Sequence, residues 1–288
     1  MTSLALVLVL IFFSWSQKSI PGETQSKFSL SKSPVLDFVP APVPIDEGKL
    51  VPNISARNVF IMDRNSRIVL YQKQADQKIF PASTTKMMTA LVVLDNFDLQ
   101  KKILVTRSYP IGQNLELKPG EILSVEQLMY AMLVQSANDA AEILAENLPG
   151  GRQAFIDAMN TKAVLIHLTN THFTNPTGVD EDDHYSTASD LARLADVALK
   201  NPEFSRIVAT ENAVIATHVV TNVNQLLGKI QGVIGVKTGY TEGAGQSLVT
   251  LVDRESHQGL ISLLGSEDRF GDTEKIIDWI YTNFKWEN

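Results

Sequence analysis

The stretch Pro81-Ala82-Ser83-Thr84-Thr85-Lys86-Met87-Met88-Thr89-Ala90-Leu91-Val92-Val93-Leu94 joins a short polar turn directly to an apolar segment. From Met87 to Leu94 only Thr89 is polar, which is typical of a helix buried on nearly all sides in the centre of a domain. Pro81 stands just before it, where a missing backbone N–H costs little. We therefore predict that this stretch is the first turn of a central, buried helix.

Ser83 and Lys86 are three residues apart, so on a helix their side chains share one face. A serine hydroxyl becomes a good nucleophile when a base takes its proton, and lysine can be that base if burial or another cation lowers its pKa. The same spacing recurs at Ser29 and Lys32, but in a proline-rich stretch without a helix to hold the geometry. Taken alone, the Ser83 pair is better explained as a helix-start serine beside a solvated lysine. Other motifs in the chain, which could form a site together with Ser83 and Lys86, decide between the two interpretations.

Composition limits the class of protein. The chain has 288 residues, 44% of them hydrophobic, which is enough for one large domain or two small ones. The net charge of −7 and the scattered basic residues argue against a nucleic-acid partner. The absence of cysteine excludes a disulfide framework and a thiolate site. These properties are consistent with an exported bacterial protein.

The N-terminal region is predicted to consist of a leader and a spacer. Residues 4–15 are apolar except for Ser14, too short for a comfortable membrane span but suitable for a signal sequence. No Lys or Arg precedes this run and no clear Ala-x-Ala site follows it, so residues 1–17 are predicted to be a signal peptide or an N-terminal membrane anchor. Residues 18–50 contain five of the twelve prolines and are predicted to be an extended spacer. Residues 51–288 are then the folded domain, placed outside the cytoplasm.

Hydrophobic patterning predicts an α+β domain. Capping pairs mark two helix starts, Ser124 with Gln127 and Thr187 with Asp190. The first of these helices breaks at residues 135–138. A hairpin before the helices must rejoin strands after them in one sheet. The expected strands are 58–62, 67–73, 213–220, 232–239, 247–253 and 260–265, and the other expected helices are 139–147, 153–168, 188–199 and 273–284.

Two further motifs could complete a site. Ser136-Ala137-Asn138 lies between two predicted helices, where a loop can direct side chains into a cleft, although both residue types also favour plain helix caps. Lys237-Thr238-Gly239 ends a strand-like run, where the glycine permits close approach of another backbone. A strand end followed by a glycine turn is its structural alternative.

Ser-x-x-Lys, Ser-x-Asn and Lys-Thr-Gly, in this order, are the motifs of penicillin-binding proteins and class A β-lactamases. Residues 55–286 resemble the serine D-alanyl-D-alanine carboxypeptidase family, the low-molecular-mass penicillin-binding proteins. The likeness extends to residues 81–89, 136–141, 175–178, 184–188 and 237–241. It implies a β-lactamase/transpeptidase-like fold: an antiparallel sheet of about five strands, with the N-terminal hairpin joined to the C-terminal strands, flanked by helices, plus an all-helical subdomain.

The resemblance also implies a reaction. Ser83 would attack the carbonyl between two terminal D-alanines of a peptidoglycan stem pentapeptide while Lys86 takes its proton. Ser136 would relay a proton to the leaving amine, and water would release the acyl-enzyme, so that no metal or cofactor is required. β-Lactam antibiotics would act as covalent inhibitors.

Substrate binding is assigned in the same way. Asn138 would hold the substrate backbone, Lys237 would keep Lys86 neutral by repulsion, and Thr238 would bind the terminal carboxylate beside Gly239. The backbone N–H groups of Ser83 and Tyr240 would form the oxyanion hole.

Other classes of protein share parts of this pattern. A D,D-endopeptidase that cuts peptidoglycan cross-links uses the same residues, and a non-catalytic muropeptide-binding protein belongs to another class; both stay open. An efficient class A β-lactamase is not expected, because no Glu-x-x-x-Asn lies between the second and third motifs. The five histidines form no zinc motif, and His184 is expected to be structural. Since the chain ends at Asn288, we expect no β-rich second domain and no C-terminal anchor of the kind common in the family.

Overall fold

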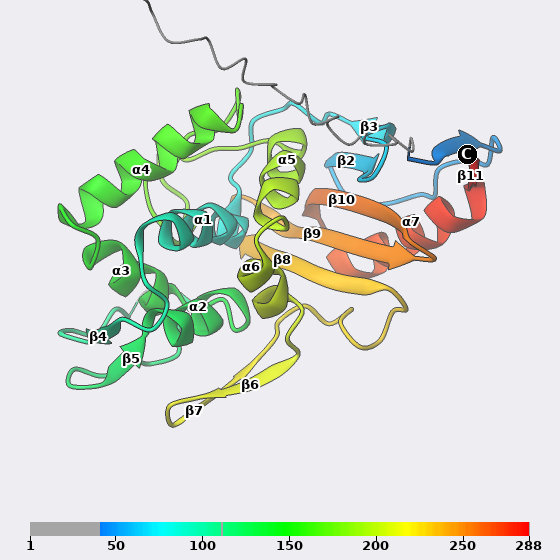
Figure 1. The fold of residues 1–288 in the computed structure, drawn as a ribbon. Helices are drawn as coiled ribbons and strands as arrows, with labels where there is room; N and C mark the ends of the chain where they lie inside the picture. The colour runs from blue at the N-terminus through cyan, green and yellow to red at the C-terminus, as the bar shows by residue number, and fades with distance from the viewer. Residues whose placement is uncertain (1–40, 111, 288) are drawn as a thin grey trace, which may run out of the picture. The chain divides into compact units, whose positions relative to one another are not determined.

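The computed structural model describes residues 41–110 and 112–287. The predicted leader (1–17), most of the predicted spacer and the Ser29–Lys32 pair lie outside the described residues. The centre of the domain is a five-stranded antiparallel sheet (Figure 1), as predicted. In spatial order its strands are β3 (Val69–Lys73), β2 (Asn58–Asp63), β10 (His257–Ser266), β9 (Gly245–Arg254) and β8 (Val233–Thr241).

Both faces of the sheet are buried. Alternate residues of β10 enter different cores: Leu260 and Leu264 pack on one side, and Ile261 and Leu263 on the other. The C-terminal helix α7 (Arg269–Asn283) covers the second face with its isoleucines, and α1 (Lys86–Asn96), α5 (Ala188–Ala198) and α6 (Pro202–Val208) cover the first. A strand buried on both sides must be apolar throughout, which explains the nearly continuous apolar run in β10.

The remaining helices form the helical part that was predicted. They are α2 (Val125–Leu133), α3 (Asn138–Glu146) and α4 (Gly151–Leu165), and all three pack on α1. The capping box predicted at the start of α2 is present: Ser124 Oγ accepts from the backbone N–H of Gln127 at 3.1 Å, and the amide oxygen of Gln127 accepts from the N–H of Ser124 at 2.8 Å. Thr187 likewise caps α5, with its hydroxyl accepting from the N–H of Asp190. Helix α1 thus lies between the sheet and the helical part.

Some predicted elements were wrong in detail. Ser83 does not lie in the first turn of the α-helix but in a separate 3₁₀ turn, η1 (Ala82–Thr85), and α1 begins at Lys86. The predicted strand 213–220 is a hairpin, β6 (Asn212–Ile215) and β7 (His218–Thr221), because Ala216 turns the chain with a φ of +49° although no glycine or asparagine marks it. Helix α6 and the short hairpin of β4 (Lys102–Leu104) and β5 (Ile122–Ser124) were not predicted.

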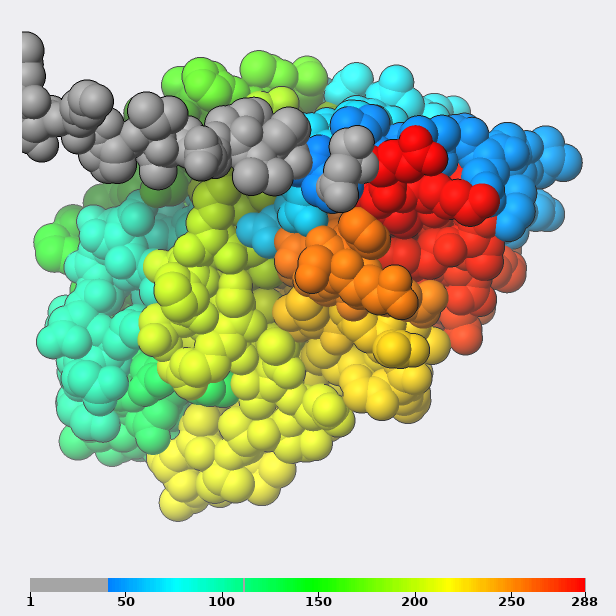
Figure 2. All heavy atoms as spheres, turned by 45° about the vertical axis from the view of Figure 1, so that its right-hand side comes forward, coloured from blue at the N-terminus to red at the C-terminus, as the bar shows by residue number. Residues whose placement is uncertain are grey.

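The predicted spacer boundary at residue 50 is also wrong. Strand β1 (Val43–Asp46) pairs antiparallel with β11 (Phe284–Glu287). Beyond it, the carbonyl of Lys49 accepts from the indole N–H of Trp279 at 3.1 Å, and the N–H of Lys49 donates to Asn283 Oδ1 at 2.6 Å. Figure 2 shows the blue N-terminal residues directly beside the red C-terminal ones. Residues 43–50 therefore belong to the folded domain.

This pairing predicts that two N-terminal deletions behave differently. Deleting residues 1–42 keeps β1 and should leave the thermal transition unchanged. Deleting residues 1–50 removes β1 and the Lys49 hydrogen bonds, and a loss of about 2 kcal/mol should lower the Tm by roughly 4–8 °C. Scanning calorimetry on the two variants measures the difference. Equal Tm values would show that β1 does not stabilise the domain.

Candidate active site

The nucleophile turn η1 carries Ser83 at the amino end of α1, and Lys86 follows as the first residue of the helix. Lys86 is completely buried. Its Nζ lies 2.8 Å from Ser83 Oγ, 2.6 Å from Asn138 Oδ1 and 2.8 Å from the carbonyl oxygen of Thr177. A neutral amine has two N–H groups and one lone pair. It can donate to the amide oxygen and to the carbonyl, which only accept, and its lone pair is then left for the hydroxyl proton of Ser83.

The pKa of Lys86 favours that neutral form. Burial lowers it well below the ordinary value of 10.5, and the positive charge of Lys237 lowers it further. The carboxylates of Asp139 and Glu142 oppose this shift with smaller effects. Glu142 is itself paired with Arg152, at 2.8 Å between Oε2 and Nε. The net result is a lysine that can accept a proton from Ser83.

Ser136 lies, as expected, between the helices α2 and α3, and Asn138 is the first residue of α3. Ser136 has a φ of +64°, an unusual backbone conformation for serine. Its Oγ accepts from Lys237 Nζ at 2.9 Å, so the second and third motifs meet in space. Lys237 is buried, and desolvation together with the nearby charge of Arg269 lowers its pKa to about 7. The site therefore contains two serine–lysine pairs, Ser83 with Lys86 and Ser136 with Lys237.

Strand β8 approaches the nucleophile turn closely at Gly239. A Cβ atom on this glycine would lie 3.0 Å from the Cβ of Ala82 and 3.3 Å from the backbone nitrogen of Ser83. The predicted reason for a glycine in the third motif is thus confirmed. Because β8 is the edge strand of the sheet, one side of its backbone is open beside Ser83.

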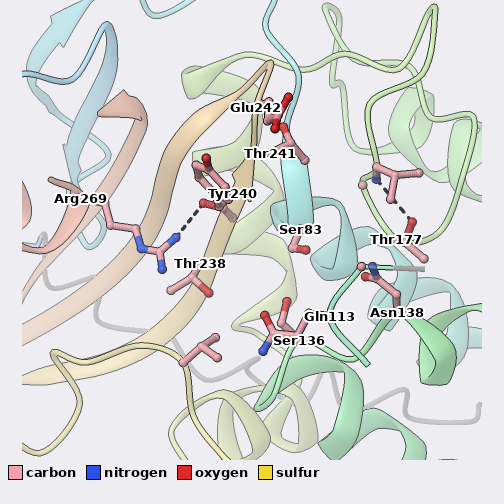
Figure 3. Close-up of a pocket in the computed structure, with 15 residues that line it drawn as sticks. Ser83, Gln113, Ser136, Asn138, Thr177, Thr238, Tyr240, Thr241, Glu242 and Arg269 are labelled. Atoms are coloured by element: carbon pink, nitrogen blue, oxygen red, sulfur yellow. Dashed lines mark hydrogen bonds between the residues drawn. The ribbon is translucent and has the colours of Figure 1, made fainter. Parts of the chain in front are cut away.

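These elements enclose a cavity of about 410 Å³ (Figure 3). Ser83 lies at its centre, with the helical part on one side and β8 on the other. All but two of the site residues predicted from the sequence line this cavity. The two exceptions, Lys86 and Lys237, are buried, and each is hydrogen-bonded to a serine that lines the cavity, Ser83 and Ser136 respectively. The lining that bears on the chemistry is Ser83, Ser136, Asn138, Thr238, Gly239, Tyr240 and Arg269.

Residues 175–178 support the base. Asn175 Oδ1 accepts from the backbone N–H groups of Thr177 at 3.2 Å and Gly178 at 2.7 Å, a local turn that directs the Thr177 carbonyl to Lys86. Gly178 has a φ of +89°, and a Cβ there would lie 1.8 Å from the carbonyl oxygen of Ala82. From the sequence, this motif contributed to the family resemblance but had no assigned role. Its role is to hold Lys86 and the nucleophile turn together.

Sequence reasoning missed Arg269. This residue begins α7, which was predicted to begin four residues later, and no motif marks it. Its Nη1 donates to the carbonyl of Gly239 at 2.9 Å, and its Nε is buried without a hydrogen-bond partner among the described residues. Figure 3 shows the guanidinium directed toward β8 beside Thr238. Arg269 and Thr238 thus form a cationic, hydroxyl-bearing end of the cavity.

His184 is structural, as expected. Its Nδ1 accepts from the backbone N–H of Thr174 at 3.0 Å, which leaves the ring proton on Nε2 to donate to Thr85 Oγ1 at 2.9 Å. Burial lowers its pKa to about 4, so the ring is neutral at pH 7. Thr85 belongs to η1, so this histidine fixes the turn that carries Ser83. Among residues 41–110 and 112–287, no three His, Asp or Glu side chains are grouped as metal ligands.

Comparison with known proteins agrees with this geometry. A family model described as D-alanyl-D-alanine carboxypeptidase matches residues 46–265. The chain belongs to the D-alanyl-D-alanine carboxypeptidase family. The match includes all three motifs and the sheet that brings them together, and it confirms the resemblance inferred from the motifs.

Individual members of the carboxypeptidase family are similar in sequence to this protein over most of its length. The D-alanyl-D-alanine carboxypeptidase DacF of Bacillus subtilis is 29% identical, covering 87% of this chain and 69% of that protein. A D-alanyl-D-alanine endopeptidase of Pseudomonas aeruginosa is 31% identical over 80% of this chain and 78% of its own length. The crystal structure of the Streptomyces K15 DD-transpeptidase is 32% identical with a TM-score of 0.77, covering 81% of this chain and all of that one. The predicted fold class is therefore confirmed.

Proposed function

We propose that this protein is a serine D,D-carboxypeptidase that removes the terminal D-alanine from peptidoglycan stem pentapeptides through an acyl-enzyme on Ser83. The observation that carries the proposal is the buried Lys86, whose Nζ lies 2.8 Å from the Ser83 hydroxyl at the floor of an open cavity. Membership of the carboxypeptidase family supplies the substrate class.

Acylation follows from this arrangement. Ser83 Oγ attacks the carbonyl between the two terminal D-alanines, and Lys86 takes the hydroxyl proton. The oxyanion is held by the backbone N–H groups of Ser83 and Tyr240, each donor of this kind being worth about 3 kcal/mol. The C–N bond then breaks, and Ser136, bonded to Lys237, gives its hydroxyl proton to the departing amine of D-alanine and receives in its place the proton that Lys86 took from Ser83, so that Lys86 is neutral again. Water, activated by the same base, hydrolyses the ester and restores Ser83.

The terminal carboxylate of the substrate is assigned to the end of the cavity formed by Thr238 and Arg269. The hydroxyl donates to one carboxylate oxygen, and the guanidinium of Arg269, which lines the cavity, supplies positive charge. Asn138 has two assignments. Its side-chain oxygen already binds Lys86, so it orients the base, while its amide N–H₂ serves the substrate backbone.

Penicillins and related β-lactams would acylate the same Ser83, since their strained amide occupies the position of the scissile bond. We assign the enzyme to the extracytoplasmic side of the membrane, where peptidoglycan lies, and we propose that residues 1–17 attach it there. No helix within residues 41–110 and 112–287 has the length and apolar character needed to cross a bilayer.

A D,D-endopeptidase is the second candidate, because one of the relatives bears that name. Incubating the purified protein with a stem pentapeptide and, separately, with a cross-linked muropeptide distinguishes the two. Release of free D-alanine from the pentapeptide supports the carboxypeptidase, and conversion of the cross-linked dimer to monomers supports the endopeptidase. Failure of both reactions together with labelling by penicillin would leave the acylation chemistry but exclude these substrates. Failure of labelling as well would favour a non-catalytic muropeptide-binding protein.

The role of Lys237 can be read from a pH–rate profile. Its positive charge lowers the pKa of Lys86, so Lys237→Ala should let Lys86 stay protonated to higher pH. The acid-side limb of kcat/KM, which reports loss of the proton from the base, should therefore move to higher pH, and substrate binding should weaken. Lys237→Arg keeps the charge and should leave the limb in place. A limb that stays put or moves to lower pH in Lys237→Ala would reduce the role of Lys237 to holding substrate.

A further inference from the structure

The catalytic cavity has opposite charges at its two ends. One end holds Arg269 and the buried Lys237 behind Thr238. The other end, where β8 finishes at Thr241, is lined by the exposed carboxylate of Glu242. Figure 3 shows Glu242 and Thr241 above Ser83, and Thr238 below them beside Arg269. The two ends therefore select different groups of one substrate.

The direction of the substrate follows from the assigned positions. If the terminal carboxylate lies at Thr238 and the scissile carbonyl at the N–H of Tyr240, the substrate runs antiparallel to β8. An extended peptide can then pair with this edge strand. Its residues on the amino side of the scissile bond continue past Tyr240 toward Thr241 and Glu242. The residue that precedes the two D-alanines, the third of the stem peptide, is the one that reaches Glu242.

No basic side chain of the described residues neutralises Glu242 within 4.0 Å. A second carboxylate, Asp180, is fixed next to it: its oxygens accept from Thr241 Oγ1 at 2.7 Å and from the N–H of Gly243 at 3.1 Å. A cation does lie near this turn: the guanidinium of Arg57 donates a hydrogen bond to the carbonyl oxygen of Ala244. A positive group on the substrate would thus meet two carboxylates, neither of which is paired with a cation within 4.0 Å among the described residues.

We propose that Glu242 is a specificity-determining residue that favours stem peptides whose third residue carries a free side-chain ammonium group. This inference rests on the proposed carboxypeptidase function and deepens it by naming the substrate class. The amine binds Glu242 while the terminal carboxylate binds at Thr238 and Arg269, so a peptide with both charges is held at two ends and its scissile carbonyl is placed at Ser83.

Two synthetic peptides test the proposal: Nα-acetyl-L-Lys-D-Ala-D-Ala, with a free ε-amine, and the Nα,Nε-diacetyl peptide, in which this amine is neutral. Release of D-alanine gives kcat/KM for each. The unmodified protein should prefer the free amine by about fivefold, the effect of one partly exposed ion pair, and the preference should fall as salt rises. Glu242→Gln should lose this preference, so that its kcat/KM values for the two peptides become equal. Glu274→Gln, the same charge change on the exposed face of α7, should keep it.

The outcomes are distinct. The same preference in Glu242→Gln as in the unmodified protein would overturn the proposal, as would no preference in the unmodified protein. Hydrolysis of neither peptide by any variant would instead contradict the carboxypeptidase function, because the diacetyl peptide does not depend on Glu242.

Discussion

Ser83→Ala is expected to abolish both the release of D-alanine and covalent labelling by a fluorescent penicillin. Within the part of the chain that the structure describes, Ser83 Oγ is the one serine hydroxyl hydrogen-bonded to Lys86 Nζ, and Ser136 Oγ is bound by Lys237 instead. Loss of a serine nucleophile costs on the order of 10⁴- to 10⁶-fold in kcat. The release assay and the gel signal of labelled protein measure this loss.

The matched control for this variant is Ser108→Ala, at an exposed serine away from the cavity, which should label and hydrolyse normally. Ser83→Ala itself should keep its thermal transition, because it removes only one oxygen atom at the cavity surface. Intact-mass and peptide analysis of the penicillin adduct locates the nucleophile. An adduct on Ser29 or Ser136 would contradict the assignment.

The second large effect is expected at Lys86. If this residue is the base in both half-reactions, Lys86→Ala should slow acylation and deacylation by roughly 10²- to 10⁴-fold, while non-covalent binding of the peptide survives. Stopped-flow labelling with penicillin, release of the label and equilibrium binding of a D-alanyl-D-alanine peptide measure the three steps separately.

Lys86 is completely buried and holds Asn138 and the Thr177 carbonyl, so its removal also leaves unpaired polar groups in the interior. Lys86→Met nearly preserves the side-chain volume and serves as the second variant when Lys86→Ala unfolds. Lys275→Ala, at an exposed lysine on α7, is the control. Acylation at the normal rate by a folded Lys86→Met protein would show that another group takes the proton of Ser83.

Local patterns predicted most elements because their cause is local. The capping pairs at Ser124 and Thr187 are contacts over three residues, and both helices begin where these pairs are. The hairpin of β6 and β7 was missed because Ala216 turns the chain without a turn-favouring residue. The pairing of β1 with β11 was missed because it joins the two ends of the domain, and a proline-rich stretch gives no local sign of such a partner.

What the sequence by itself determined is the set of reactive groups: Ser83 and Lys86 three residues apart, Ser136 and Asn138 two residues apart, and Lys237 in a strand-like run. Only the tertiary structure decided how these groups act. Burial of Lys86 against Asn138 and Thr177 lowers its pKa, and the packing of η1 on β8 brings the charge of Lys237 close enough to lower it further. Arg269 entered the site through packing of α7 on the sheet, without a motif. A pKa shift depends on desolvation and on distances between charges, and both come from residues far apart in the chain, which no local pattern records.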